Sequence, residues 1–306
     1  MNVKLASTTG DFLTLLSEDY LESVRRVAKA GFRYIDISFY NMTTDGPLMA
    51  DDWKTYVDQM RMLEKALGVT YVQAHLPNAN PLDEKSFDEY LARTIRAIEV
   101  CGMLGIRNAV IHVGWRAGIT KEEFFALNRA ALQPLFPTME QYGVNVLVEN
   151  STRANMGEMY YFLTGSDMKE FLRYVDHPLL HACWDTGHAN IEGGQYEHIH
   201  ALGNDLRAVH VHDNLGDCDR HALPFTGTLN MDEVLNALMD IDYSGFFTFE
   251  ADGAVSVGDG WLSHRREFVN DTRLFNPTLA IWDAAERFLY EIGKSCLVAY
   301  GIYEED

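Results

Sequence analysis

Eight short apolar runs alternate with longer amphipathic segments along the 306-residue chain. Several of the runs are apolar almost throughout, which is typical of strands that are covered on both faces, as in a parallel sheet. The runs span residues 3–8, 34–39, 69–75, 108–114, 145–150, 181–187, 206–213 and 245–251.

The segments between the runs have the periodicity of helices. In residues 18–31, 88–105 and 121–143, apolar side chains recur every three or four positions and a glycine follows before the next run. Eight strands, each followed by a helical pattern, predict an α/β fold, a single-domain (β/α)8 TIM barrel over residues 1–306. A doubly wound open sheet is the alternative, and the lack of a GxGxxG motif after the first strand disfavours its dinucleotide-binding version.

The stretch after the eighth predicted strand, residues 252–277, is long for a loop between a strand and a helix. In a barrel it would lie over the mouth formed by the C-terminal ends of the strands, as a lid or as a subunit contact. A plain surface excursion is the alternative, and the sequence does not decide between them.

Histidines and carboxylates gather at the C-terminal ends of the last six predicted strands. In a barrel these ends meet at one mouth, where enzymes of this fold place their active sites. A single histidine there is more often a hydrogen-bonded structural residue, but six strands that each contribute a polar group indicate a functional site. The residues are His75, His112, Glu149, Asp185 followed by His188, His210 with His212, and Glu250.

The types of side chain restrict the chemistry of this site. Mixed imidazole and carboxylate ligands suit zinc, manganese, iron or cobalt, whereas oxygen ligands alone would suit magnesium or calcium better. No cysteine stands among these residues, which argues against a structural zinc site held by thiolates. The pattern therefore predicts a catalytic site for a divalent metal.

The overall composition restricts the partners and the compartment. With 45 acidic and 25 basic residues the formal net charge is -20, which disfavours a nucleic acid as the main partner and suits a small polar substrate. The four cysteines form no CxxC pair, as is typical of reduced thiols in a cytoplasmic protein. The start has no signal-peptide pattern and no run of about 18 apolar residues predicts a membrane span. We therefore expect a cytoplasmic protein that does not enter a membrane.

Five motifs, taken together and in their order, carry a resemblance to a known family. They are LVENST at 147–152, CWDTGHAN at 183–190, HVHDN at 210–214, DRH at 219–221 and FFTFEADG at 246–253. The chain, to about its eighth strand, thereby resembles the xylose isomerase-like TIM-barrel superfamily, in particular its sugar phosphate isomerase/epimerase branch. The resemblance implies a metal held by one residue from each of strands five to eight: Glu149, Asp185, His210 and Glu250. His212 is the alternative to His210, because both lie on the same face of the strand.

The resemblance implies a metal-dependent isomerase or epimerase that acts on a sugar, a sugar phosphate or another polyol. Glu149 and Glu250 would be the catalytic pair, which passes a proton off and onto the substrate through a metal-stabilised enediolate. Among divalent ions we expect manganese, with zinc, cobalt, magnesium and iron as alternatives. Aldose–ketose isomerisation, or a dehydration that begins with the same deprotonation, would use the same residues.

Several aromatic and basic residues are expected to contact the substrate. Trp115 and Trp261 would each offer an apolar face to a sugar ring, whereas core packing is the favoured interpretation of Trp184. Arginines that follow strand ends would bind a phosphate or a carboxylate if they face the pocket, which would separate sugar phosphates from free sugars. They are Arg116, Arg153 and Arg220.

The remaining histidines have two interpretations. His188, in a strand-to-loop context, would bind a substrate hydroxyl or orient a metal ligand, and His75 and His112 would line the pocket together with Asp219 and His221. The main alternative activity is that of the endonuclease IV-like DNA repair enzymes of the same superfamily, which carry three zinc ions. Their additional ligands would match the same five residues: His75, His112, His188, Asp219 and His221.

Three features count against DNA repair. The charge is acidic, the loops are not rich in lysine or arginine, and the context HVGWRAG after His112 departs from that family. A dehydratase or a non-catalytic subunit built on the same barrel is a further alternative. Oligomers are common for barrels of this kind, so a homo-oligomer is compatible with the sequence, which identifies no interface.

Overall fold

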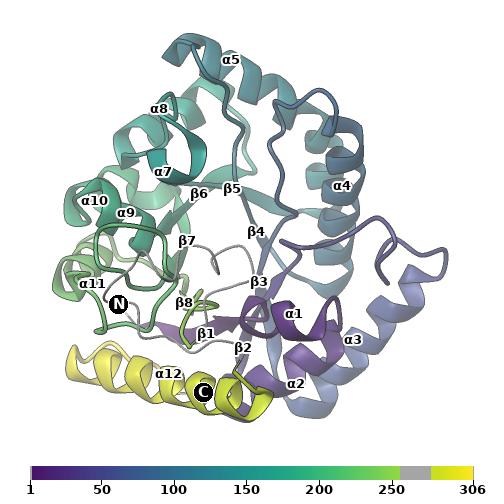
Figure 1. Cartoon of the computed structure of the whole chain (residues 1–306), viewed down its shortest axis with the longest axis vertical. Coiled ribbons are helices and arrows are strands. Elements are labelled where there is room, and N and C mark those ends of the chain that lie inside the picture. The colour runs from purple at the N-terminus through teal and green to yellow at the C-terminus, as the bar shows by residue number, and fades with distance from the viewer. Residues whose placement is uncertain (1, 256–276, 306) are drawn as a thin grey trace.

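The computed structural model describes residues 2–255 and 277–305 of the chain. Within them, eight strands form one closed barrel, in which neighbours along the chain pair in parallel and β1 pairs with β8 (Figure 1). The predicted α/β class and (β/α)8 TIM barrel are confirmed, and every predicted run contains a strand. The strands are β1 (Lys4–Thr8), β2 (Tyr34–Ser38), β3 (Thr70–His75), β4 (Asn108–Ile111), β5 (Asn145–Glu149), β6 (Leu180–Asp185), β7 (Leu206–Val211) and β8 (Phe246–Phe249).

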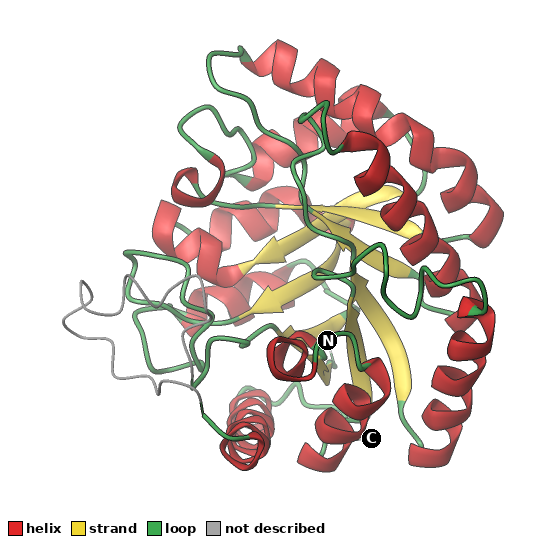
Figure 2. Cartoon of the chain, turned by 45° about the vertical axis from the view of Figure 1, so that its right-hand side comes forward, coloured by secondary structure: helices red, strands yellow, loops and turns green. Residues whose placement is uncertain are grey.

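Helices surround the strands on the outside of the barrel (Figures 1 and 2). No helix of the described ranges is long and apolar enough to cross a membrane. The segment expected to act as a lid or contact, 252–277, lies outside the described residues from 256 to 276. The α-helices are α1 (Gly10–Leu16), α2 (Tyr20–Ala30), α3 (Trp53–Leu67), α4 (Phe87–Leu104), α5 (Lys121–Leu132), α6 (Phe136–Tyr142), α7 (Arg153–Met156), α8 (Gly165–Val175), α9 (Thr186–Glu192), α10 (Tyr196–Leu202), α11 (Met231–Asp240) and α12 (Leu279–Ala299), and the 3₁₀ helices are η1 (Gln133–Leu135) and η2 (Gly203–Asp205).

The helical segment expected over 121–143 is divided in the structure. α5 ends at Leu132, η1 follows, and α6 begins at Phe136. Pro134 lies in η1 and Pro137 in the first turn of α6. Proline has no N–H to donate and its ring collides with the preceding helical turn, so the chain tightens into a 3₁₀ turn there. The apolar periodicity continues across this break and therefore hides it in the sequence.

Alternation along the strands sets a polar layer above an apolar one inside the barrel. One buried cluster takes a residue from each of β4 to β7: Val110, Leu147, Cys183 and Ala208. Two positions further along the chain, and therefore on the same face, stand four polar residues: His112, Glu149, Asp185 and His210. The apolar residues of the opposite face belong to the main core. The fold thus directs the polar groups of several strands to the C-terminal mouth.

Candidate active site

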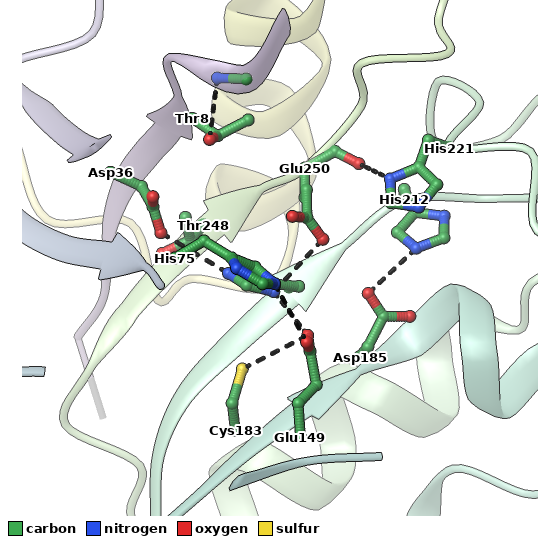
Figure 3. Close-up of polar contacts among 12 residues, drawn as sticks. Thr8, Asp36, His75, Glu149, Cys183, Asp185, His212, His221, Thr248 and Glu250 are labelled. Atoms are coloured by element: carbon green, nitrogen blue, oxygen red, sulfur yellow. Dashed lines mark hydrogen bonds and ion pairs between the residues drawn. The ribbon is translucent and has the colours of Figure 1, made fainter. Parts of the chain in front are cut away.

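Four side chains that the resemblance assigned to a metal meet at the mouth of the barrel, and Figure 3 labels three of them, Glu149, Asp185 and Glu250. Glu149 and Asp185 end β5 and β6, His210 lies in β7, and Glu250 directly follows β8. One ligand atom of each lies within 4.8 Å of those of the other three. The Nδ1 atom of His210 is 2.6 Å from Glu149 Oε1 and 3.2 Å from Glu250 Oε2. The structure therefore brings the predicted set together.

These four residues fit a divalent metal ion. Glu149, Asp185 and His210 are fully buried, and buried charges are normally paired with each other or bound to a metal. The Oε2 atom of Glu149 makes no hydrogen bond within the described part of the chain. A buried set of carboxylates and one imidazole, with an oxygen left over, suits ions such as manganese, zinc, iron and cobalt.

The surroundings shift the pKa values of Glu149 and Glu250 in opposite directions. Burial would raise the pKa of Glu149, but the charge of His210 and the hydrogen bond from its ring outweigh it and hold that pKa well below its usual range. Burial raises the pKa of Glu250, and the charges of His210 and His221 offset this only in part. Of the two carboxyls, Glu149 ionises more readily and Glu250 holds a proton more readily.

The two histidines of the HxH pattern have different neighbours. His210 faces Glu149 and Glu250, as described above. His212, one residue beyond β7, has its Nε2 atom 3.0 Å from Asp185 Oδ2, and its ring stacks on that of His221 with centroids 3.9 Å apart. Both are fully buried. His210 belongs to the group with Glu149, Asp185 and Glu250, whereas His212 belongs to a group with His221 and Glu250.

A second group of ligand-type atoms consists of His188, Asp219 and His221. Asp219 bridges the two rings, with His188 Nε2 at 3.0 Å and His221 Nε2 at 3.2 Å. His188 lies in the first turn of α9 and not in a loop as expected, because Asp185 caps that helix and accepts a hydrogen bond from the His188 N–H. Burial would lower the pKa of His188, but Asp185 and Asp219 outweigh it and raise the pKa to about 10.

His75 and His112 form a third group with Glu149. Their Nε2 atoms lie 3.5 and 3.4 Å from Glu149 Oε2. Burial lowers the pKa of His112 to about 3, so its ring is neutral at physiological pH.

Across the whole site, several buried ligand-type atoms have no hydrogen-bond partner among the described residues, and a bound ion or substrate would satisfy them. They include Nδ1 of His112 and Nδ1 of His212.

A cavity of about 610 Å³ lies at the mouth of the barrel, and residues of all three ligand groups line it. Arg153 does not belong to its lining, and the head group of Arg153 pairs with Glu192 at 2.5 Å. Glu149, Asp185, His210 and His212 are fully buried instead of lining it. The predicted residues in the lining are His75, His112, Trp115, His188, Asp219, Arg220, His221 and Glu250.

The tryptophans fall into two kinds: some line the cavity and one is buried in the core of the protein. Trp115 lines the cavity and is 37% exposed. Trp184 is fully buried and donates its ring N–H to Gln195, which confirms the core interpretation. Trp261 lies outside the described residues. Trp282 of α12, which the sequence did not single out, is a further wall residue.

Sequence reasoning missed the polar groups that support the site from earlier strands. Asp36 of β2 is fully buried and its Oδ2 atom lies 3.5 Å from His210 Nε2. Gln73 of β3 donates to the same Asp36 oxygen and lies 2.9 Å from His210 Nε2. Asn155 donates to Asp219 Oδ2. The signal for Asp36 was present, because a carboxylate stands in the middle of the apolar run 34–39.

The glycine of the CWDTGHAN motif, Gly187, lies so close to a neighbouring side chain that there is no room for a Cβ atom. A Cβ atom on Gly187 would lie 2.0 Å from Cε1 of the His212 ring. The carbonyl of Gly187 also accepts a hydrogen bond from Asn214. The motif therefore allows α9 to start directly against β7.

The fold and the site define a TIM-barrel protein whose mouth is built from imidazoles and carboxylates. The model of the xylose isomerase-like TIM barrel family matches residues 24–270, and the chain belongs to this family.

Relatives of the chain include sugar 3-epimerases. The match with the uncharacterized protein y4fM of Sinorhizobium fredii is 32% identical over 163 residues and covers 50% of each chain, so this chain spans about half the length of that relative. The match with the D-psicose 3-epimerase of Ruminiclostridium cellulolyticum is 24% identical over 246 residues and covers 76% of this chain and 78% of that one. The solved structure of D-psicose 3-epimerase with D-tagatose from Clostridium cellulolyticum H10 has the same fold, with a TM-score of 0.74 at 19% identity, over 96% of this chain and 99% of that chain.

Proposed function

We propose that this protein is a metal-dependent epimerase or isomerase of small sugars. The observation that carries the proposal is the meeting of Glu149 of β5 and Glu250, which follows β8, with Asp185 and His210 next to a cavity that Glu250 lines. The similarity to a D-psicose 3-epimerase over 76% of the chain supports the same class of reaction.

Glu149, Asp185, His210 and Glu250 would hold the divalent ion, for which we propose manganese, with zinc, cobalt, magnesium and iron as alternatives. When bound, such an ion supplies Lewis acidity toward the carbonyl and neighbouring hydroxyl oxygens of a sugar.

The chain's own carboxylates would move the proton. One of Glu149 and Glu250 takes the proton from the carbon next to the carbonyl onto a carboxylate oxygen, and the electron pair of that C–H bond forms the enediolate. The other glutamate, which comes from a different strand, returns a proton to the opposite face of the same carbon and inverts it. His188 and Asp219 in the cavity wall would bind substrate hydroxyls and fix the sugar between the two carboxyls.

The pairing of the arginines favours an uncharged sugar over a sugar phosphate. Arg220 lines the cavity, but Asp217 takes its Nε and one terminal nitrogen at 3.0 and 2.6 Å. Arg153 is paired with Glu192. A phosphate would have to compete with these carboxylates for each guanidinium.

The test is epimerisation of a panel of free ketohexoses and ketopentoses, followed by chromatography of the products. We expect new epimers with the metal-loaded protein, loss of turnover after EDTA treatment, and recovery with manganese or cobalt. Full activity of protein that analysis shows to be free of metal, or no turnover of any sugar in the panel, would contradict the proposal.

Abasic-site DNA repair is the second candidate function, favoured by the two additional ligand groups around His75 and around Asp219. It predicts about three zinc ions per chain by elemental analysis and nicking of a duplex that contains an abasic site. One bound ion per chain, together with no nicking, would rule out DNA repair and keep the sugar reaction as the proposed function.

A further inference from the structure

The outer wall of the cavity carries two exposed aromatic side chains. Trp115 follows β4 and Tyr40 follows β2, and each is 37% exposed although both line the cavity. A large ring that stays open to solvent in a concave site provides apolar area for a ligand, since such area gains free energy when it is covered.

Trp115 is held in place by its neighbours. The side chain of Asn80 accepts a hydrogen bond from the backbone N–H of Trp115 at 3.1 Å and donates one to the backbone carbonyl of Trp115 at 2.8 Å. Asn128 holds Gly114 in the same way, at 2.7 and 3.0 Å. The indole ring lies over Gly157, where an added Cβ would be 3.7 Å from Cε3. The backbone that carries the indole is thus held in place, and a residue that is ordered before binding lowers the entropy cost of binding a ligand.

Tyr40 lies between this outer wall and the inner histidines. Its ring centroid is 5.1 Å from that of His75 and 6.4 Å from that of His112. Its hydroxyl accepts a hydrogen bond from Asn78 at 2.6 Å. Since Asn78 and Trp115 follow the strand ends by several residues, the cavity has an inner part at the histidines and an outer part at these residues.

The cavity extends from the inner histidines to Trp115 and Tyr40. Its volume of about 610 Å³ lies within the range of roughly 300–1,000 Å³ of pockets that enclose drug-sized ligands. A keto sugar held at Glu250 and the inner histidines would leave the outer part with Trp115 and Tyr40 uncovered. Arg220, which lines the cavity, is paired with Asp217, so the described part of the lining favours an uncharged occupant over an anionic one.

We propose that Trp115, Tyr40 and Asn78 form a second sugar-binding subsite, so that the substrate is a keto sugar linked to a second, uncharged ring. The proposal rests on the proposed function, because it places the keto sugar at the inner end. The C–H face of the second ring packs on the indole, and its hydroxyls bond to the amide and phenol groups.

The test is isothermal titration of manganese-loaded protein with D-fructose, fructose 6-phosphate and two disaccharides that contain fructose, lactulose and isomaltulose. We expect one disaccharide or both to bind about tenfold more tightly than fructose, a gain of the size that an additional aromatic contact supplies. In Trp115→Ala this preference for the disaccharide should fall to about one, and Trp115→Phe should keep part of it.

Phe288→Ala is the control, because Phe288 is an exposed aromatic residue of α12, 55% exposed, and is no part of the cavity lining. It should keep the wild-type preference. The subsite proposal is wrong if neither disaccharide binds more tightly than fructose, if Trp115→Ala weakens fructose and disaccharide equally, or if fructose 6-phosphate binds best. Fructose that is bound and epimerised in those cases leaves the proposed function standing. No binding of any of the four sugars overturns the subsite proposal alone, because the proposed function fails only if no sugar of its own panel is turned over.

Discussion

The Nε2 atom of His210 lies 3.5 Å from the Oδ2 atom of Asp36, a fully buried carboxylate of β2. The other ring nitrogen of His210 faces Glu149 and Glu250. For Nδ1 to offer its lone pair to a metal, Nε2 must carry the ring proton. Asp36 is the carboxylate that faces Nε2, and the Gln73 side chain, which is hydrogen-bonded to Asp36 and lies 2.9 Å from Nε2, is the closer neighbour of that atom. Asp36 thus orients a proposed ligand without contacting the ion.

Asp36→Asn should weaken metal binding. An amide accepts the imidazole proton less strongly than a carboxylate, and loss of such a partner costs about 10- to 100-fold in metal affinity. Titration of the metal-free protein with manganese would measure this. Asp58→Asn, on the exposed face of α3, is the matched control, and equal affinities in both variants would remove Asp36 from this role.

Glu250→Gln should lower kcat by about two to four orders of magnitude, since an amide cannot take or return the proton. The direct measurement is solvent deuterium entering the substrate carbon, followed by NMR, because it reports the C–H step alone. The exposed Glu89→Gln on α4 is the control. Wild-type exchange in Glu250→Gln would refute the assigned proton transfer.

Gly187→Ala should destabilise the protein by about 1–3 kcal/mol, the usual cost of overpacking a buried site, because the added Cβ would meet the His212 ring at 2.0 Å. Urea unfolding measures the change. If the clash with His212 is the cause, adding Gly187→Ala to His212→Ala should cost little further stability. An equal cost in both backgrounds would show that the strain lies elsewhere.

The strands and the central group could be predicted because each depends on short local patterns. Apolar runs mark strands that are buried on both faces, and Glu149 and Asp185 end such runs. The support from Asp36 could not be predicted in the same way, because it depends on the register of β2 around the closed barrel, which brings it beside His210 of β7.

Two misplacements have local physical causes. Arg153 was expected at the pocket because it follows a strand-end motif, yet it pairs with Glu192 of α9, a partner that only the fold brings near. His188 was expected in a strand-to-loop context, because it comes three residues after Asp185 at the end of a predicted strand. The Asp185 cap starts the helix there nonetheless.

Two buried acids outside the site should make the stability of the protein depend on pH. Asp11 of α1 and Glu286 of α12 are each 2% exposed. Burial and the neighbouring Glu286 carboxylate raise the pKa of Asp11 well above its usual value, and burial likewise raises the pKa of Glu286. The native state therefore keeps protons that the unfolded state releases above about pH 4. Stability contributed by these groups is present at low pH and is lost as the pH rises through the native pKa values.

Glu286→Gln should weaken this dependence, because the amide cannot ionise and Asp11 loses a charged neighbour. We therefore expect the free energy of unfolding of the variant to fall less than that of the wild type between pH 5 and pH 8. Urea unfolding at both pH values measures the free energies, and the comparison cancels the contribution of other titrating groups. Glu291→Gln, an exposed substitution on the same helix, should behave like the wild type. Equal losses in all three proteins would show that Asp11 and Glu286 do not hold protons in the native state.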